Sequence, residues 1–534
     1  MTEARDRPPR GKAIAGSELL LGLTAWVAVV TVGQWTCRAP FPLLNDDVAY
    51  LVDACGLARL GALEWDPGYA ALYCGLRHAF KDPLAAFWAK QSAVPLLAGL
   101  LVHRLGLVFR LGPVLAPLSA LWCVLALLAV NGTVEFAFVL GLMACLCAAT
   151  GSRAGWMGFF GLMGLAFLVR VEYLVGTAAA LALLLRYRVD GARGARTAGG
   201  LVLAGGLLLA GMGGVAAGGR SWFAFGQQFA VNHAEAGGLA VDPLVEWQRV
   251  AGQAFPTSRS IADAVRENPR MVAWHLGYNA LVRMPRAVAG ALVPVPSFVP
   301  WLRGREVLAA AVVLLVFVAV TLGARSGELH VPRILPLLAL ATIPAVSLIF
   351  RPQARHLLPL VPLAIVVAAT GIRRRADERP PSLAGGLRLA FAGVLLVGLA
   401  SPWVFWARTP APIEASLGGW IRELRREARA GPMRLLASWY ADRVCGLVGP
   451  DCHPVSLADF IDGHEMDGAL IGPDWAARPD VQRDARVRGF VSRPEAFGCA
   501  GSTATPDGFR LVRCRSPLRL APTAPAAPPS RPSS

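Results

Sequence analysis

The feature that most constrains this chain is a series of apolar stretches about as long as a bilayer-spanning helix. About eleven occur, near residues 18–36, 92–109, 113–130, 134–150, 155–171, 173–187, 198–219, 305–323, 333–350, 356–372 and 387–407. A spanning helix needs about 20 mostly apolar residues. The composition agrees, because 55% of the residues are hydrophobic and 16% are charged, against about 25% charged in soluble domains. The sequence therefore predicts an all-α polytopic membrane protein with about 11 transmembrane helices.

The cations are distributed unevenly over the connections between these stretches. The net charge is +17, and most of the arginines in short connections fall on one predicted side of the membrane. By the positive-inside rule that side is cytoplasmic, together with the N-terminus, and segments 37–91, 220–304 and 408–534 lie outside. Topology thus accounts for the basic excess, and no nucleic-acid partner is expected.

The chain divides by composition into three parts. Residues 1–407 hold the apolar stretches, residues 408–520 are predicted to form a small α/β extracytoplasmic domain, and residues 521–534 a disordered tail. In the second part a helix is expected over 414–429 and strands over 433–440, 468–475 and 509–515. The first apolar stretch lacks a small-residue cleavage site, so it is interpreted as a retained span. We expect a multi-pass protein of the bacterial inner (cytoplasmic) membrane, with the C-terminal domain in the periplasm.

Four cysteines support this assignment of the C-terminal part. Cys445, Cys452, Cys499 and Cys514 all fall in the predicted external domain. They allow three pairings, of which 445–452 with 499–514 is the simplest. Disulfides suit an oxidising compartment.

Acidic residues follow the first apolar stretch. Asp46 and Asp47 are adjacent, and Asp66 precedes Pro67. An acidic pair is often a solvated turn or a helix cap. At a membrane boundary, partial desolvation would instead raise the pKa of a carboxylate and make it usable as a base.

Further ionisable residues fall at the ends of predicted spans on the outer side. Glu135 opens the fourth span, and Arg170 and Glu172 flank the turn between the fifth and sixth. Such residues mark a site or pair with one another. A structural Arg170–Glu172 pair, or cations reaching toward the interface, would explain them equally.

A basic cluster on the outer side breaks the positive-inside trend. Arg351, Arg355 and His356 lie there, and the second outer segment adds Arg283, Arg286, Arg303 and Arg305. Arginine forks match phosphate oxygens, so an anionic ligand is one explanation. Contact with lipid headgroups is the other.

Several common kinds of site have no support in the sequence. His233, His275 and His453 show no ligand spacing and are interpreted as surface residues. The chain contains no Walker-type loop, no GxSxG and no HExxH motif, so ATP-driven transport and zinc or serine hydrolysis are not supported.

The order and sidedness of these motifs resemble the GT-C superfamily of polytopic glycosyltransferases. The branch is similar to bacterial protein O-mannosyltransferases and lipid A aminoarabinose transferases. The segments that carry the resemblance are DDVAY at 46–50, DPGY at 66–69, Glu135, RVE at 170–172 and RHLLP at 355–359. The likeness covers about residues 50 to 372 and implies a GT-C-like domain over 1–407.

The resemblance implies a membrane glycosyltransferase that uses a polyprenyl-phosphate-linked sugar and inverts the anomeric centre. Asp46 would be the general base, and Asp47 would orient it or bind the acceptor. Substrate contacts are implied for Tyr50, Asp66, Glu135, Arg170, Glu172, Arg355 and His356. The partners would be the lipid-linked donor, a lipid, glycan or protein acceptor, and membrane lipids. No cofactor is certain, although carboxylates near a phosphate could hold Mg²⁺ or Mn²⁺.

Three other classes of protein compete with this interpretation. A transporter or flippase predicts broken helices and an internal repeat, and no clear repeat is present. A lipid-linked oligosaccharide polymerase or ligase predicts an outer segment rich in arginine and histidine, which 220–304 partly provides. A non-catalytic scaffold would leave the charges at 135, 170 and 172 without a purpose.

Overall fold

The structure is a computed structural model whose described residues form two compact bodies. It describes residues 67–80, 83–109, 134–187, 193–212, 220–237, 246–292, 331–364, 417–437, 441–472, 475–477, 479–501 and 510–520, with isolated positions between 111 and 127 and at 366. The first body lies within residues 67–366 and the second within 417–520. Each is described by itself.

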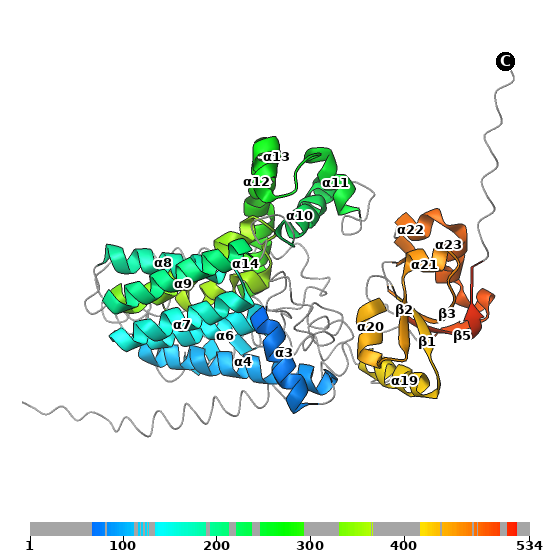
Figure 1. Cartoon of the computed structure of the whole chain (residues 1–534), viewed down its shortest axis with the longest axis horizontal. Helices are drawn as coiled ribbons and strands as arrows, with labels where there is room; N and C mark the ends of the chain where they lie inside the picture. The colour runs from blue at the N-terminus through cyan, green and yellow to red at the C-terminus, as the bar shows by residue number, and fades with distance from the viewer. Residues whose placement is uncertain are drawn as a thin grey trace, which may run out of the picture. The chain divides into compact units, whose positions relative to one another are not determined.

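A layer of packed helices makes up most of the first body (Figure 1). Its helices are α3 (Pro67–Ala79), α4 (Pro83–Val108), α6 (Val134–Ala149), α7 (Arg153–Val169), α8 (Tyr173–Arg186), α9 (Arg193–Met212) and α16 (Val331–Leu340). Helix α6 is buried along most of its length, against α4, α7 and α16. Its residues are apolar on all sides, as expected of a helix at the centre of a layer.

Short turns determine which helix ends lie together. Between α6 and α7, Gly151 has a φ of +71°, a backbone conformation that is strained for residues with a side chain. The Ser152 hydroxyl caps α7 by accepting a hydrogen bond from the Gly155 N–H at 3.0 Å. A Cβ on Gly155 would lie 2.2 Å from the Cys147 carbonyl oxygen, so glycine is required there. Since α7 and α8 also follow each other closely, the start of α6, the end of α7 and the start of α8 lie at the same end of the layer.

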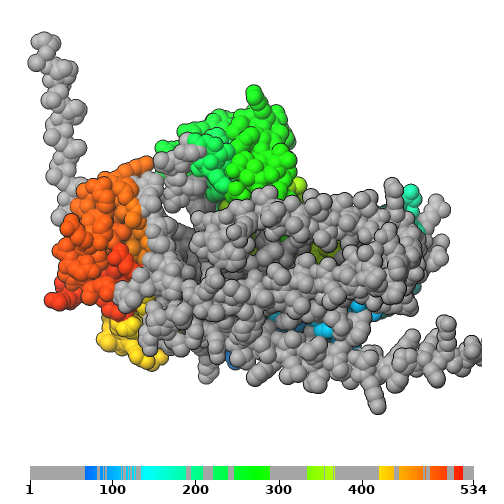
Figure 2. Space-filling view, turned by 180° about the vertical axis from the view of Figure 1, so that it is seen from behind, coloured from blue at the N-terminus to red at the C-terminus, as the bar shows by residue number. Residues whose placement is uncertain are grey.

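A second group of helices in this body carries an aromatic core. It consists of α10 (Arg220–Gly237), α11 (Trp247–Ala254), α12 (Ile261–Glu267), α13 (Pro269–Tyr278), the π-helical turn η3 (Asn279–Arg283) and α14 (Met284–Leu292). Phe225, Phe229 and Phe255 form the centre of its core. Helices α10 to α13 project from the layer as a lobe, which Figure 2 shows in green from the opposite side.

Two 3₁₀ segments complete the first body. They are η5 (Ile343–Leu348) and η6 (Ala354–Leu360). Segment η6 packs against α14 and α6, and Leu357 shares a small core with Ala287. Residues 349–356 therefore connect the projecting lobe to the helix layer.

The helices overturn the predicted fold class. Helices α6, α7 and α8 contain 16, 17 and 14 residues, which at 1.5 Å per residue is less than a hydrocarbon core of about 30 Å. Helix α4 has 26 residues but includes Lys90, Pro95, His103 and Arg104. Across the described ranges, no helix combines the length and the apolar character needed to cross a membrane. The prediction of an all-α polytopic protein with about 11 transmembrane helices is therefore wrong, and the stretches near 18–36, 305–323 and 387–407 lie outside the described residues.

The second body is built on a mixed five-stranded sheet in the order β2-β1-β3-β5-β4. The strands are β1 (Met433–Ala437), β2 (Cys452–Val455), β3 (Met466–Ile471), β4 (Cys499–Gly501) and β5 (Arg510–Leu518). Strand β1 is parallel to β2 and β3, whereas β5 is antiparallel to β3 and β4. The helices are α19 (Leu417–Ala430), α20 (Ala441–Val448), α21 (Leu457–Ile461), α22 (Pro479–Arg483) and α23 (Ala485–Ser492). The expected helix and three expected strands correspond to α19, β1, β3 and β5, and the sequence analysis missed β2 and β4.

Two disulfides tie this sheet together. Cys445–Cys452 links α20 to β2, and Cys499–Cys514 joins β4 to its register partner in β5. The simplest of the three pairings is thereby confirmed. In the first body Cys74 is also disulfide-bonded.

Candidate functional site

The predicted catalytic residues precede Pro67, the first described residue, in the sequence. Asp46, Asp47, Tyr50 and Asp66 fall outside the described residues. The description begins at Pro67, the first residue of α3, whose N-terminal end packs against the end of α7 near Val169. The remaining predicted residues can be located in the structure.

Glu135 belongs to a buried ion pair that the sequence analysis missed. It lies in the first turn of α6 and accepts a hydrogen bond of 2.8 Å from Lys90 Nζ on α4, and both side chains are fully buried. The Lys90 ammonium also lies 5.7 Å from the ring centroid of Tyr69 on α3. A charge this deep is tolerated only when it is paired. Lys90 is one of only three lysines in a chain rich in arginine, which is the signal that could have identified it.

Arg170 and Glu172 pair with each other across the turn between α7 and α8. Arg170 Nε donates to Glu172 Oε2 at 3.2 Å, and a second, shorter contact joins Nη2 to Oε1. Both side chains are mostly buried. The structural pair that the sequence allowed is thus observed.

His356 and Arg355 are brought close to this turn by η6. The residues that act electrostatically on the His356 ring include Arg355 and Arg170. The structure therefore gathers Arg170, Arg355 and His356, which are far apart in the sequence, at one end of the helix layer. Glu135, at the start of α6, belongs to the same end through the contact between α6 and η6.

Three further arginines lie close to one another where the projecting lobe joins the helix layer. Arg283 is buried over the Tyr278 ring, with 5.6 Å from its Cζ to the ring centroid. Arg283 Nη2 contacts Glu235 Oε2, and Arg286 Nη1 donates to Glu235 Oε1 at 3.2 Å. Arg351 is partly buried, and within the described part of the chain no carboxylate contacts it. We call Arg283, Arg286 and Arg351 the arginine cluster.

The charges of the arginine cluster are only partly neutralised. Burial, with Arg351 and Arg286 nearby, lowers the pKa of Arg283 to about 10. Burial also lowers the pKa of Arg351, and Arg286 contributes to the same shift. Arg283 and Arg286 share one carboxylate, Glu235, whose side chain is 40% exposed, and among the described residues no carboxylate contacts Arg351. Such a surplus of guanidinium groups suits a ligand with several anionic oxygens.

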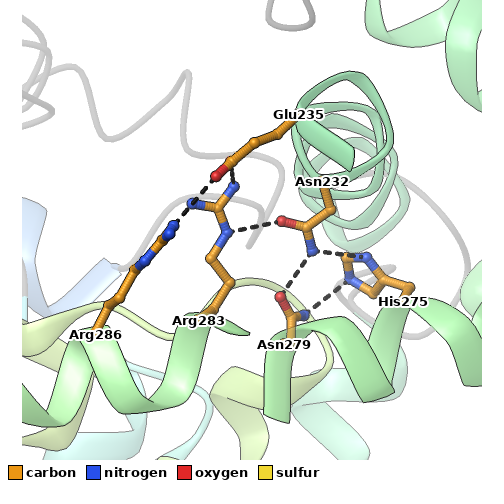
Figure 3. A network of polar contacts seen from close by, with 6 residues as sticks. All are labelled: Asn232, Glu235, His275, Asn279, Arg283 and Arg286. Atoms are coloured by element: carbon orange, nitrogen blue, oxygen red, sulfur yellow. Dashed lines mark hydrogen bonds and ion pairs between the residues drawn. The ribbon is translucent and has the colours of Figure 1, made fainter. Parts of the chain in front are cut away.

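A network of buried amide and imidazole groups supports the cluster (Figure 3). Asn232 on α10 lies between Arg283, Asn279 and His275, and all three of Asn232, His275 and Asn279 are fully buried. His275 was interpreted as a surface residue, and this prediction is wrong. His275, Asn279 and Arg283 recur every four residues on one helix, a polar stripe in an apolar segment that could have indicated their burial.

No cation site is visible in the ranges that the structure describes. Within them, no group of three or more His, Cys, Asp or Glu side chains is arranged to hold a metal ion. The carboxylates considered for Mg²⁺ or Mn²⁺ at positions 46, 47 and 66 are outside these ranges.

The sequence matches no protein-family profile and no curated protein. The structure is similar to the archaeal oligosaccharyltransferase AglB from Archaeoglobus fulgidus in complex with an inhibitory peptide and a dolichol-phosphate, with 13% identity, a TM-score of 0.46, and coverage of 93% of this chain and 74% of that one. A second structure of the Archaeoglobus fulgidus oligosaccharyltransferase, tethered to an acceptor peptide containing the NVT sequon, gives 12% identity and a TM-score of 0.44, with 94% and 74% coverage.

Proposed function

We propose that this protein is a glycosyltransferase that moves a sugar from a polyprenyl-phosphate-linked donor to an acceptor hydroxyl, with inversion. The observation that carries the proposal is the arginine cluster, whose Arg351 lies four residues before Arg355, which with His356 begins the RHLLP motif. Its surplus positive charge suits the phosphate of such a donor. The acceptor would be a lipid, a glycan or a protein.

The arginines would act on the leaving group. As the bond between the anomeric carbon and the phosphate oxygen breaks, its electron pair stays on the phosphate, whose negative charge grows. Guanidinium groups already fixed in place stabilise that charge more in the transition state than in the ground state. Arg355, with Arg170 and His356 beside it, is assigned to the same phosphate.

The acceptor would be activated by a carboxylate. Its oxygen forms the new bond to the anomeric carbon on the face opposite the phosphate, and its proton passes to Asp46. Help from a general base is worth about 10²–10⁴-fold in rate. Asp47 would orient Asp46 or bind the acceptor, and Tyr50, Asp66 and Glu172 would bind substrate. Glu135 is assigned an indirect part, because it is paired with Lys90.

We place this activity at the outer face of the bacterial cytoplasmic membrane, where membrane lipids surround the polyprenyl tail. The disulfides of the second body support an oxidising compartment for residues 408–520. The tail at 521–534 has no assigned part.

Two substitutions test the proposal in a transfer assay with a polyprenyl-phosphate sugar. Asp46→Asn should abolish transfer without loss of folded protein, and near-normal transfer would exclude Asp46 as the base. Asp451→Asn, the same change at an exposed turn of the second body, is the control and should be fully active. Arg355→Ala should raise the KM for the donor more than the KM for the acceptor, and equal effects would indicate a structural role.

A lipid-linked oligosaccharide polymerase or ligase is the second candidate, because arginines and a histidine of segment 220–304 do lie together (Figure 3). Both candidates use a lipid-linked donor, and the acceptor distinguishes them. Transfer to a second lipid-linked glycan would favour the polymerase or ligase. Movement of the donor across a vesicle bilayer without any transfer would favour a flippase.

A further inference from the structure

A set of hydrogen bonds runs from Arg283 to the backbone just before Arg351. Asn232 Oδ1 accepts from Arg283 Nε at 3.0 Å, and Asn232 Nδ2 contacts His275 Nδ1 at 3.2 Å and Asn279 Oδ1 at 2.8 Å. At the other end, Asn279 Nδ2 donates to the Leu348 and Phe350 carbonyl oxygens at 2.8 Å each. Phe350 directly precedes Arg351. We call Asn232, His275 and Asn279 the amide–imidazole network.

The partners of His275 determine its protonation state. His275 Nε2 lies 3.1 Å and 3.0 Å from the carbonyl oxygens of Ile349 and Phe350. Carbonyl oxygens can only accept, so Nε2 carries the proton and Nδ1 accepts from Asn232. The Asn279 amide hydrogens are both used by carbonyls, and those of Asn232 by Nδ1 and Asn279. His275 Nε2 and Asn279 Nδ2 also lie 3.1 Å apart, because both donate to the Phe350 carbonyl oxygen. The amide and imidazole hydrogens of the three side chains thus have acceptors among the described residues.

We propose that the amide–imidazole network is a positioning device that holds Arg283 and the backbone before Arg351 at a fixed separation for one anionic ligand. The identity of that ligand as the donor phosphate rests on the proposed function, whereas the positioning role does not. Asn232 restrains the guanidinium of Arg283 directly. His275 and Asn279 restrain residues 348–350, and through them the start of Arg351.

The electrostatics explain why such a device is needed. Arg283 and Arg351 repel each other, and burial raises the cost of both charges. Without restraint, the two guanidinium groups would separate toward solvent and would have to be reassembled when an anion binds. Restraint in advance removes that cost from binding.

The local backbone supports this interpretation. The helix widens into a π-helical turn at Asn279–Arg283. Both end residues of this turn, Asn279 and Arg283, form hydrogen bonds with Asn232. Such turns are uncommon and are frequently found at functional sites. An apolar core would stabilise this position as well as the network does, so stability alone gives no reason for three buried polar side chains here.

The test measures sulfate binding by the full-length protein, because sulfate mimics the phosphate oxygens and requires no sugar. His275→Leu removes the hydrogen bonds of both ring nitrogens, whereas His275→Gln keeps one acceptor and one donor in the side-chain amide. His233→Leu is the matched control, because His233 lies in the same lobe and stacks on Phe229. Calorimetric titration gives the Kd for sulfate, and thermal unfolding is recorded in parallel.

We expect His275→Leu to weaken sulfate binding at least about tenfold, and His275→Gln to retain affinity within about threefold of the natural protein. The control should bind as the natural protein does. Unchanged affinity in folded His275→Leu, equal losses in both His275 variants, or no sulfate binding by the natural protein would each overturn the proposal. If His275→Leu does not fold, Asn279→Ala replaces it, and unchanged affinity in that variant likewise overturns the proposal.

The transfer assay separates this proposal from the proposed function. Sulfate affinity that depends on His275 in a protein without transfer activity would refute the function and support the positioning role. Active transfer together with normal sulfate affinity in His275→Leu would refute the positioning role alone.

Discussion

Replacing Arg351 with glutamine should weaken donor binding and leave the protein as stable as before or more stable. Arg351 is partly buried, and among the described residues no carboxylate contacts it. Burial and the nearby Arg286 lower its pKa below the usual value for an arginine. A base with a lowered pKa in the folded state is one whose charged form the fold disfavours. The side chain remains charged near pH 7, so the folded protein carries this cost and the substitution removes it.

The loss of affinity follows from the bond that glutamine cannot make. A charge-assisted hydrogen bond contributes about 1.5–3 kcal/mol. Since about 1.4 kcal/mol corresponds to a factor of ten, the KM for the donor should rise about 10- to 150-fold. A gain in stability with a loss of function is common where binding sites hold unfavourable charges.

The assay measures the donor KM and the thermal unfolding midpoint of the same preparations. Arg434→Gln is the control, because Arg434 Nη1 donates to Glu465 at 2.6 Å and Arg434 Nε to Asp467 at 3.2 Å in the second body. That variant should lose stability and keep its donor KM. A lower unfolding midpoint with an unchanged donor KM in Arg351→Gln would refute the reasoning and make Arg351 a structural residue.

Three further outcomes are expected. Replacing both Cys499 and Cys514 with serine opens a loop with a sequence separation of 15 and should cost about 3 kcal/mol by loop entropy, measured by denaturant unfolding under non-reducing conditions against the natural protein with its disulfides intact. Burial lowers the pKa of His275 below 6.5, so the unfolded chain binds the extra proton first as the pH falls. The stabilising contribution of the neutral His275 ring is complete above about pH 6.5 and decreases below it, by at most about 1.4 kcal/mol per pH unit. His275→Gln should lack this part of the pH dependence of the free energy of unfolding. Ser456→Ala removes the capping box with Asp459 at the start of α21 and should cost about 1 kcal/mol, with equal stability counting against the cap.

The apolar pattern located several helices but not their lengths. Residues 134–150, 155–171 and 173–187 were expected to be helical and correspond to α6, α7 and α8. A run of apolar residues indicates a helix, but its ends are set by turns and caps, which the run itself does not show. The turn at Gly151 and the turn at Arg170 limit these helices to 17 residues or fewer.

The cysteine pairing in the second body could be predicted from the sequence, because four cysteines allow only three pairings and the observed one joins neighbours in the chain. Strand β4 was missed because its three residues are too short to show an alternating pattern. It becomes a strand only by pairing with β5, opposite Cys514.

The sequence by itself determined which residues carry charge at the ends of helices and which of them repeat along one helix. For this reason Glu135, Arg170, Glu172, Arg355 and His356 could be selected from their positions in the chain alone. Spacing along a chain determines which side chains share a face of a helix, because the helical repeat is constant.

Only the tertiary structure decided which partner each helix face contacts. Lys90 pairs with Glu135, 45 residues away in the sequence, and Asn232 contacts His275, 43 residues away. His275 contacts the Phe350 carbonyl oxygen, 75 residues away. These partners come together because apolar packing of α4 on α6, and of α10 on α13, brings the helices into contact. Packing is non-directional and depends on the whole surface of both elements. The four-residue spacing of His275, Asn279 and Arg283 could have indicated that these side chains are buried, but no local pattern in the sequence indicates which partners they meet.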